Sequence, residues 1–588
     1  MRKLILNSFA LLFTSLTLLS QTKTSDELLL KAMKDESARS IKSLKLENLD
    51  APYFIEYGLT FIDSYQVTAS LGSLLDIEDN KVANLTANVR VGDYNFDNTN
   101  FFDFGLSFFG SGDDEERFKR RNIPYYIDYS GLRRELWLAT DAAYKQSAEI
   151  YSKKIATKKN RLNLDTTPDF SKITNPYKGI VASNKMTYDR SKCEDLVRKI
   201  SAIFKDYPEI TNSKVIVEVI PKKYLYISTE GTEYVKSENY IGLEVYAFTQ
   251  ASDGSPVADF ISFYQENYSD LPSLDSLTKA TKEICENINR QTITKKLEES
   301  YSGPILFEKQ AAAQLFAQMF ANNLAAQRAI MTESGVQENE RGSAFQNKIG
   351  ARVLPEFISL EDKPSLVNWG KTKLFGISQI DDDGIASQDL TLVKDGYLKT
   401  LLSSRIPTKK IKTSNGRNRR GGTMYTNLLI TSKPEKELND YELKSKLIEL
   451  IKNRDLPYGI IVKKILDQNI LATGILNLAA GNMQFPRAVG AFIPSLVYKV
   501  YQDGREELVR GVTGAGFTPQ TFKDIINVSK SKYALNFLAP AIISSFISGG
   551  DSYVNSSVVC PSFLIEDGEI KTLNTDFKKP PFMANPIK

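Results

Sequence analysis

Side chains suited to catalysis or metal binding are few in this chain. None of its 588 residues is His, which rules out an imidazole ligand to zinc, a Ser-His or Cys-His nucleophile, and acid–base catalysis by imidazole. The three cysteines have spacings that predict no metal knuckle. Carboxylates remain as candidates, because Glu308, Asp381, Asp382 and Asp383 would favour Mg²⁺ or Ca²⁺ over Zn²⁺. The Asp run has no fixed ligand spacing, however, and is more typical of a turn.

The segment Gly303–Ile330 is the element around which we expect the chain to be organised. After a short apolar strand, the stretch from Ala311 onward contains no Gly or Pro and is rich in alanine. Ala, Leu, Met and Gln favour helix. Apolar residues also recur at four-residue spacing, as Leu315 with Met319 and Phe316 with Phe320. The pattern predicts one buried helix that packs closely through its alanines.

The same segment resembles the strand-to-helix motif of the TldD/PmbA family of zinc peptidases and their inactivated relatives. Active members carry His-Glu-x-x-x-His there; in this chain the first His falls on Ala317, the Glu on Gln318 and the second His on Asn322. Ala has no metal donor, and neutral amides cannot act as general bases near neutral pH. On an ideal helix Gln318 and Asn322 lie about 40° apart, and Ala317 and Asn322 about 140° apart. The resemblance therefore implies a degenerate motif in which a pocket remains without zinc, and no cofactor is expected.

Further short segments resemble the family in the same order along the chain. They include ANVRVGDYNFD at Ala87–Asp97, FQNKIGARVLP at Phe345–Pro355, DDDGIASQDLTLVKDGYLKTLLSSRIP at Asp381–Pro407, and VVCPSFLIEDGEI at Val558–Ile570. The first of these is similar to exported members of the family. Active members supply a Cys ligand near the C-terminus, and that position falls near Ile547 or Ser548 rather than at Cys560.

The segment SNGRNRR, residues 414–420, corresponds to a part of the family that lies near the substrate groove in active members. The resemblance makes Asn415, Gly416 and Arg417 candidates for contacts with a substrate. The segment also belongs to a basic run that comprises Lys409, Lys410, Lys412, Arg417, Arg419 and Arg420. Such a run could bind phosphate, but it has no aromatic residues among its charges and the chain is nearly neutral. A solvated loop is therefore the expectation.

Composition places the chain among ordinary globular proteins, with 42% hydrophobic and 25% charged residues. A formal net charge of +4 predicts neither a nucleic-acid partner nor binding to a membrane surface. Arg2 and Lys3 precede an uncharged run from Leu4 to Ser20, which predicts a secretory signal over residues 1–20. An uncleaved anchor is the alternative, but the run contains several Ser, Thr and Asn residues. No other stretch is apolar enough to span a bilayer, so we expect a soluble protein in the periplasm or cell envelope.

A chain of this length exceeds one hydrophobic core and predicts at least two domains. Residues 21–300 alternate strand patterns with helical patterns at Tyr129–Lys159, Tyr188–Tyr207 and Pro272–Glu298. Residues 301–588 contain mostly strand patterns around the Gly303–Ile330 helix. The fold class is therefore α+β: an N-terminal domain of antiparallel sheet and helices, and a larger, mostly antiparallel C-terminal domain built around one buried helix.

Three functions are compatible with these observations. The family pairs a catalytic subunit with a sister that lacks the zinc motif, so the resemblance implies a non-catalytic partner, either a heterodimer with a catalytic TldD-like paralogue or a homodimer. Unfolded peptide would then bind as a strand added to a sheet edge, a mode that needs no metal. The second possibility is an active metallopeptidase with a non-standard carboxylate metal site. The third is an envelope peptide-binding or structural module. We do not expect the chain to be catalytic by itself.

Overall fold

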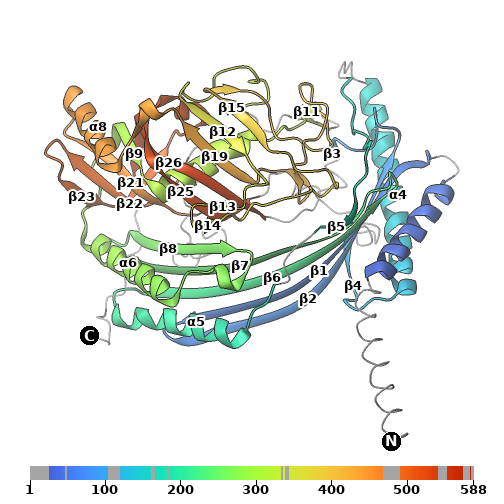
Figure 1. Cartoon of the computed structure of the whole chain (residues 1–588), viewed down its shortest axis with the longest axis horizontal. Coiled ribbons are helices and arrows are strands. Elements are labelled where there is room, and N and C mark those ends of the chain that lie inside the picture. Colours follow the sequence, from blue (N-terminus) through green and yellow to red (C-terminus); the bar gives the residue numbers. More distant parts are fainter. Residues whose placement is uncertain are drawn as a thin grey trace, which may run out of the picture.

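A computed structural model describes residues 26–46, 49–102, 120–160, 166–181, 186–332, 335–337, 344–467, 491–540, 553–573 and 583. The predicted signal segment, residues 1–20, lies outside the described residues, as do Ile547 and Ser548. The described chain forms a long curved sheet with helices on one face, and a second, larger sheet domain lies over its other face (Figure 1). None of the described helices is both long enough and apolar enough to span a bilayer.

The N-terminal sheet has seven strands in the order β4-β2-β1-β6-β7-β5, with β8 beside β7. Its strands are β1 (Pro52–Ser70), β2 (Ser73–Val91), β4 (Arg120–Ile123), β5 (Lys178–Ile180), β6 (Asn212–Ser228), β7 (Glu233–Gln250) and β8 (Pro256–Gln265). All pairings are antiparallel except that of β5 with β7. Along β1 and β6 buried residues alternate with half-buried ones, as expected when one face packs against helices.

Helices cover one face of this sheet. They are a helix over residues 26–43, α4 (Tyr129–Asn160), α5 (Arg190–Ala202) and α6 (Leu274–Ile293). Side chains of α5 and α6 such as Val197 and Ile284 pack with Val67 and Val217 of the sheet. The helix at residues 26–43 and α4 pack against the other end of the same face, around Tyr57 and its neighbours. The three helices predicted in this half are thus confirmed, with α5 and α6 several residues shorter than expected.

The larger sheet is mixed rather than purely antiparallel. Its order is β16-β15-β12-β19-β26-β9-β21-β22-β23, with β24 and β25 also beside β26, and β20 beside β25. Its strands are β9 (Tyr301–Phe307), β12 (Ile358–Asp362), β15 (Leu390–Lys394), β16 (Tyr397–Leu398), β19 (Asn427–Ser432), β20 (Glu437–Leu438), β21 (Tyr458–Ile465), β22 (Pro494–Tyr501), β23 (Glu506–Val509), β24 (Val512–Ala515), β25 (Ile525–Pro540) and β26 (Tyr553–Thr572). The pairs β19–β26, β20–β25 and β9–β21 are parallel. The α+β class is confirmed, and the predicted boundary near residue 300 stays a prediction.

Shorter strands complete the described chain. They are β3 (Phe101–Phe102), β10 (Ile330–Thr332), β11 (Gly335–Gln337), β13 (Asn368–Trp369), β14 (Thr372–Lys373), β17 (Asn418–Arg419) and β18 (Gly422–Thr423). The turn between β15 and β16 is the hairpin expected at Lys394-Asp395-Gly396, with positive φ at both Asp395 and Gly396. A Cβ at Gly396 would lie 2.5 Å from the carbonyl oxygen of Leu354, so the turn requires glycine there.

The central helix is shorter than predicted. It begins with α7 (Lys309–Leu315) and ends at Leu324, not at Ile330. Ala325 and Ala326 are extended because their backbone pairs with Leu402: Ala326 N–H donates to Leu402 O at 2.7 Å, and Leu402 N–H donates to Leu324 O at 2.9 Å. The helical preference of the two alanines is thus overridden by a contact with a residue far away in the sequence.

Candidate functional site

The segment that carries the family motif begins at an abrupt change from strand to helix. β9 ends at Phe307, and Lys309 adopts a positive φ of 43° as the first residue of α7. The Lys309 N–H donates to Ser562 Oγ of β26 at 3.0 Å. Phe316 and Phe320 stack with ring centroids 4.7 Å apart, within a core that also includes Phe522. Packing against β26 and this aromatic cluster therefore fixes where the helix starts and how it is rotated.

After Leu315 the helix widens and then tightens. Residues Phe316–Phe320 form a π-helical turn, and Ala321–Leu324 form a 3-10 turn. The Ala321 N–H donates to Phe316 O, a bond between residues five apart. A π turn brings residues at this spacing toward one face, as an α-helix does for residues four apart. The separation of about 140° between Ala317 and Asn322 assumed an ideal α-helix, whereas the segment between them is π-helical up to Phe320 and 3-10 from Ala321.

The three motif positions differ in their surroundings: Ala317 and Gln318 lie on the π turn, and Asn322 lies on the 3-10 turn that follows. Ala317 is buried in the core. Gln318 Nε2 donates to Leu466 O, just after β21, at 3.1 Å. Asn322 Oδ1 is buried and has no hydrogen-bond partner among the described residues. Gln310, eight residues before Gln318, forms two hydrogen bonds with the backbone of Ile465, each 3.0 Å long. Amide side chains of this segment thus hold the end of β21.

These residues do not fit a zinc ion. Ala317 supplies no donor atom, and the amides of Gln318 and Asn322 carry no charge to offset that of the metal. Within the part of the chain that the structure describes, no group of three or more His, Cys, Asp or Glu side chains is arranged to hold a metal. The cysteines are buried and unpaired. Burial raises the pKa of Cys193 and of Cys285 to about 12, so these thiols are poor nucleophiles and poor metal ligands near neutral pH.

The Asp run forms the expected turn. The carboxylate of Asp381 accepts hydrogen bonds from the N–H groups of Asp383 at 3.0 Å, Ile385 at 2.9 Å and Asn418 at 3.0 Å. Burial raises the pKa of Asp383 to about 6. These contacts give the side chain of Asp381 a role in holding the turn.

Asp382 of the same turn joins the two sheets. Its carboxylate accepts from Lys236 Nζ at 2.6 Å and from the Arg420 N–H at 2.6 Å. Lys236 lies on β7 of the N-terminal sheet, whereas Arg420 follows β17 of the other domain. Glu308, the fourth carboxylate candidate, precedes α7. Burial raises its pKa more than nearby Lys463 lowers it. The four carboxylates do not form one cluster of metal ligands.

The three residues proposed for a substrate groove lie in the interior. Arg417 is fully buried, its Nε donates to Asp362 Oδ2 at 2.6 Å, and the buried Asp362 belongs to β12. Asn415 joins the backbones of Leu401 and Ser403, with hydrogen bonds of 2.9 Å and 2.8 Å. Gly416 has a φ of 78°, and a Cβ there would lie 2.4 Å from Ala386 O. These contacts give each residue a structural role, and the role in a groove stays a prediction.

The solvated loop expected for the basic run is correct for its lysines and wrong for its arginines. Lys409, Lys410 and Lys412 are exposed. Arg419, by contrast, is buried and donates to the carbonyl oxygens of Tyr425 and Asn555, and Arg420 is paired with Glu238. The acidic partners of the arginines, Asp362 and Glu238, lie far away in sequence. No local pattern identifies them.

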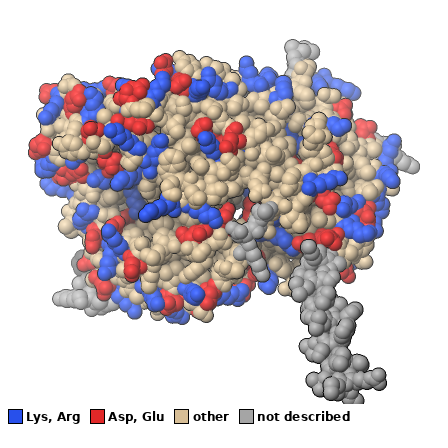
Figure 2. All heavy atoms as spheres, viewed as in Figure 1, with Lys and Arg blue, Asp and Glu red and all other residues tan. Residues whose placement is uncertain are grey.

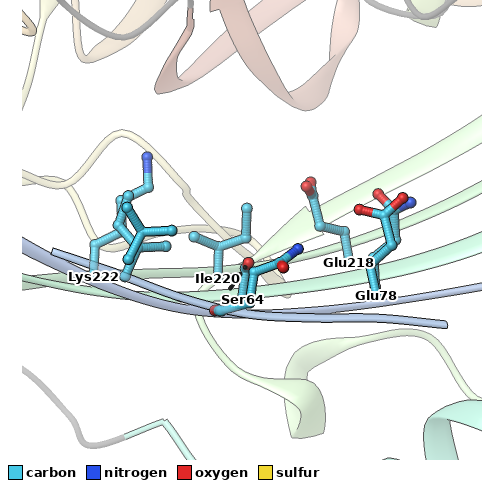
Figure 3. Close-up of a pocket in the computed structure, with 9 residues that line it drawn as sticks. Ser64, Glu78, Glu218, Ile220 and Lys222 are labelled. Carbon is cyan, nitrogen blue, oxygen red and sulfur yellow. Dashed lines mark hydrogen bonds between the residues drawn. The ribbon is translucent and has the colours of Figure 1, made fainter. Parts of the chain in front are cut away.

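Two pockets lie on the N-terminal half of the molecule. One, of about 330 Å³, lies on the face of β1, β2 and β6, where Ser64, Glu78, Glu218 and Lys222 rise from the sheet (Figure 3). The other, of about 670 Å³, lies between the first helix and the turn that joins β6 to β7. On the face shown in Figure 2, basic and acidic side chains are interspersed.

The larger sheet and its central helix form a metallopeptidase-like domain. Residues 300–572 match the PmbA/TldA metallopeptidase C-terminal domain. The C-terminal part of the chain is therefore a PmbA/TldD-type domain, in agreement with the motifs found there. No curated protein matches the sequence.

Solved structures share the fold over nearly their whole length. A candidate modulator of a DNA gyrase from Thermotoga maritima is 13% identical, with 91% of this chain and 99% of that chain covered and a TM-score of 0.55. TldE from Thermococcus kodakarensis is 12% identical, with 92% and 100% covered and a TM-score of 0.55. A candidate modulator of DNA gyrase from Bacteroides thetaiotaomicron is 11% identical, with 93% and 98% covered and the same TM-score of 0.55. At these identities the likeness establishes the fold.

Proposed function

We propose that this chain is a PmbA/TldD protein without the family's zinc site, and that it is the non-catalytic partner subunit of a zinc-bearing relative in peptide proteolysis. One observation carries the proposal. Positions 317, 318 and 322 hold Ala, Gln and Asn, on the π and 3-10 turns that follow α7. These residue types support the loss of the family's zinc ligands and general base on a strand-to-helix segment that is otherwise kept.

The contacts of Gln318 and Gln310 support this assignment. The resemblance places the motif Glu at position 318, whereas here the side chains of Gln318 and Gln310 both bind the backbone at the end of β21. The carboxylates needed for an alternative metal site are also engaged elsewhere, since Asp381 holds a turn and Asp382 binds Lys236. A hydrolase with a carboxylate metal site is for this reason the weaker proposal.

Co-purification tests the partnership. The full chain would be produced alone and together with a homologue that carries His-Glu-x-x-x-His, and mass, zinc content and hydrolysis of unfolded peptides would be measured. We expect a heterodimer in which zinc and hydrolysis depend on the homologue, with hydrolysis enhanced by this chain. One tightly held zinc per isolated chain together with peptidase activity would contradict the proposal. A chain that binds peptide but does not associate with the homologue would be a peptide-binding module instead.

We infer further that the chain is exported and works in the periplasm or cell envelope. The basic pair Arg2 and Lys3, followed by the uncharged run to Ser20, supports export. Fractionation of cells that express the full chain, with N-terminal sequencing of the mature form, tests this inference. A protein recovered from the cytosol with Met1 intact would contradict it.

A further inference from the structure

The N-terminal sheet has two edges that differ in their surroundings. At β8 the C-terminal domain covers the edge: Lys464 Nζ lies 2.7 Å from Asp259 Oδ1, and Asn536 Nδ2 donates to Tyr264 O at 3.2 Å. At the other edge, β4 pairs with β2 only from Ala83 to Thr86. Residues 73–82 of β2 pair with β1 on one side and, among the described residues, with no strand on the other. In Figure 1, β2 forms the lower border of the curved sheet.

The open part of β2 exposes two large apolar side chains. Residues 75–81 are all exposed, and Leu75 and Ile77 keep 57% and 46% of their surface accessible. Ile77 lies on the same face as Asp79, which binds Arg190 of α5 at 2.5 and 2.9 Å. Leu75 is the extra residue of a β-bulge, since Leu74 pairs with Ala69 and Asp76 pairs with Thr68. Charged residues protect many open edges from pairing with other chains, but here two aliphatic side chains lie among the charged ones and are available for contact.

The opposite face of the same stretch is acidic. Glu78 rises from the sheet beside Glu218 of β6 (Figure 3). Asp76 lies two residues earlier and therefore on the same face. Neither Asp76 nor Glu78 forms an ion pair with any described residue, whereas Asp79 and Lys81 are paired with Arg190 and Asp63. This face thus offers uncompensated negative charge directly beside the open backbone.

We propose that residues 73–82 of β2 are a docking edge for an extended segment of another polypeptide in which aliphatic and basic residues alternate. Such a segment adds a strand to the sheet, because alternate residues of β2 direct their N–H and C=O groups to the open side. Its aliphatic side chains pack on Ile77 and on Leu75 of the bulge. Its Lys or Arg side chains lie opposite Asp76 and Glu78 on the acidic face. This inference does not rest on the proposed function, since the edge lies on the N-terminal sheet and not at α7.

A fluorescent peptide of alternating Val and Lys tests the edge with the full chain. We expect it to bind, and a peptide of alternating Val and Glu not to bind. The double variant Leu75→Lys, Ile77→Lys should weaken binding by about tenfold or more, because two cross-strand contacts are lost and like charges are introduced. The matched control is Ile293→Lys at the end of α6, where the side chain is 87% exposed; it should bind as the unaltered chain does.

Hydrogen exchange supplies a second measurement that does not depend on affinity alone. Binding of the Val-Lys peptide should slow exchange of backbone amides within residues 73–82 and leave those of β8 unchanged. The proposal is overturned if the Val-Lys peptide does not bind, if the double variant binds it equally well, or if protection appears elsewhere. Concentration-dependent dimerisation of the unaltered chain that the double variant abolishes would also overturn it, because the edge would then pair with a second copy of this chain.

Discussion

At the residue scale, the interior contains charged side chains that were expected at the surface from the sequence. The basic run predicts a solvated loop, and the exposed lysines at 409, 410 and 412 agree with that. Arg417 is instead fully buried against Asp362, which lies on a strand more than fifty residues earlier. A count of charges cannot reveal such a partner, because only the folded chain brings Asp362 beside Arg417. The residue types at the motif positions could be read directly, since the absence of His is visible in the sequence itself.

Replacing Arg417 tests the value of this buried pair. Arg417→Met should lower the free energy of unfolding by about 3–5 kcal/mol, because it leaves the buried carboxylate of Asp362 without its counter-charge. Denaturant unfolding followed by the fluorescence of Trp369, in a Trp137→Phe background, measures the effect in the C-terminal domain. Lys412→Met, at an exposed position of the same run, should change stability by less than about 0.5 kcal/mol. Equal effects of the two substitutions would contradict the structural role of Arg417.

Glu244 on β7 makes stability depend on pH. Burial raises its pKa to about 7, more than the hydrogen bond from the Tyr264 hydroxyl lowers it. The folded protein therefore holds the proton more tightly than the unfolded chain, in which the group titrates near 4.5. As pH rises from about 4.5 to 7, this group should lower the free energy of unfolding by about 1–3 kcal/mol, partial exposure limiting the effect.

The variant Glu244→Gln isolates that contribution, since a neutral amide resembles the protonated carboxyl. Its stability should vary less with pH between 4.5 and 7 than that of the unaltered chain. Glu435→Gln, at an exposed position, should leave the pH dependence unchanged. The expectation is wrong if the curves for Glu244→Gln and the unaltered chain run parallel through this range.

At the element scale, the sequence identified the helix after β9 but not its shape. Four-residue spacing and alanine content predict a helix, and the structure has one there, formed by α7 and the two turns that follow it. The early end at Leu324 depends on hydrogen bonds with Leu402, and the π turn depends on packing of Phe316 and Phe320 against Phe522. Neither contact is local. The parallel pairs β19–β26 and β9–β21 likewise could not be predicted from alternation of apolar and polar residues, because alternation indicates strands but not which strands are neighbours.

The hydrogen bonds between α7 and β21 give a prediction at this scale. Gln310→Ala removes both bonds to the Ile465 backbone and leaves an N–H and a C=O without their partner, so unfolding should become easier by about 1–3 kcal/mol. Gln318→Ala removes one bond, to Leu466, and should cost about 1 kcal/mol. Thermal unfolding measures both. If Gln318→Ala proves more costly than Gln310→Ala, the amides do not act on β21 in the way the structure indicates.

At the scale of the whole molecule, the two sheet domains are joined by buried charges and by the segment of residues 166–181. Arg405 is almost fully buried; it pairs with Glu230 at 2.6 Å and donates to Ser171 O. Arg405 and Arg90 both lie close to the ring of Phe170, with guanidinium carbons 3.8 and 3.5 Å from its centroid. Two domains could be expected from chain length, but this connection could not, since its members come from four separate parts of the sequence.

Arg405→Met should therefore loosen the connection between the domains rather than unfold either core. The substitution leaves the buried carboxylate of Glu230 without its counter-charge, which costs about 3–5 kcal/mol. This loss weakens the contact between the two domains. Trp137 lies on α4 and Trp369 on β13, so single-Trp variants report each domain separately. In the unaltered chain we expect the two unfolding curves to coincide, and in Arg405→Met to separate, because two domains that no longer stabilise each other unfold independently.

The exposed neighbour variant Lys409→Met should leave the curves together. Curves that still coincide in Arg405→Met, whether shifted or not, would place the coupling in other contacts such as Lys236 with Asp382.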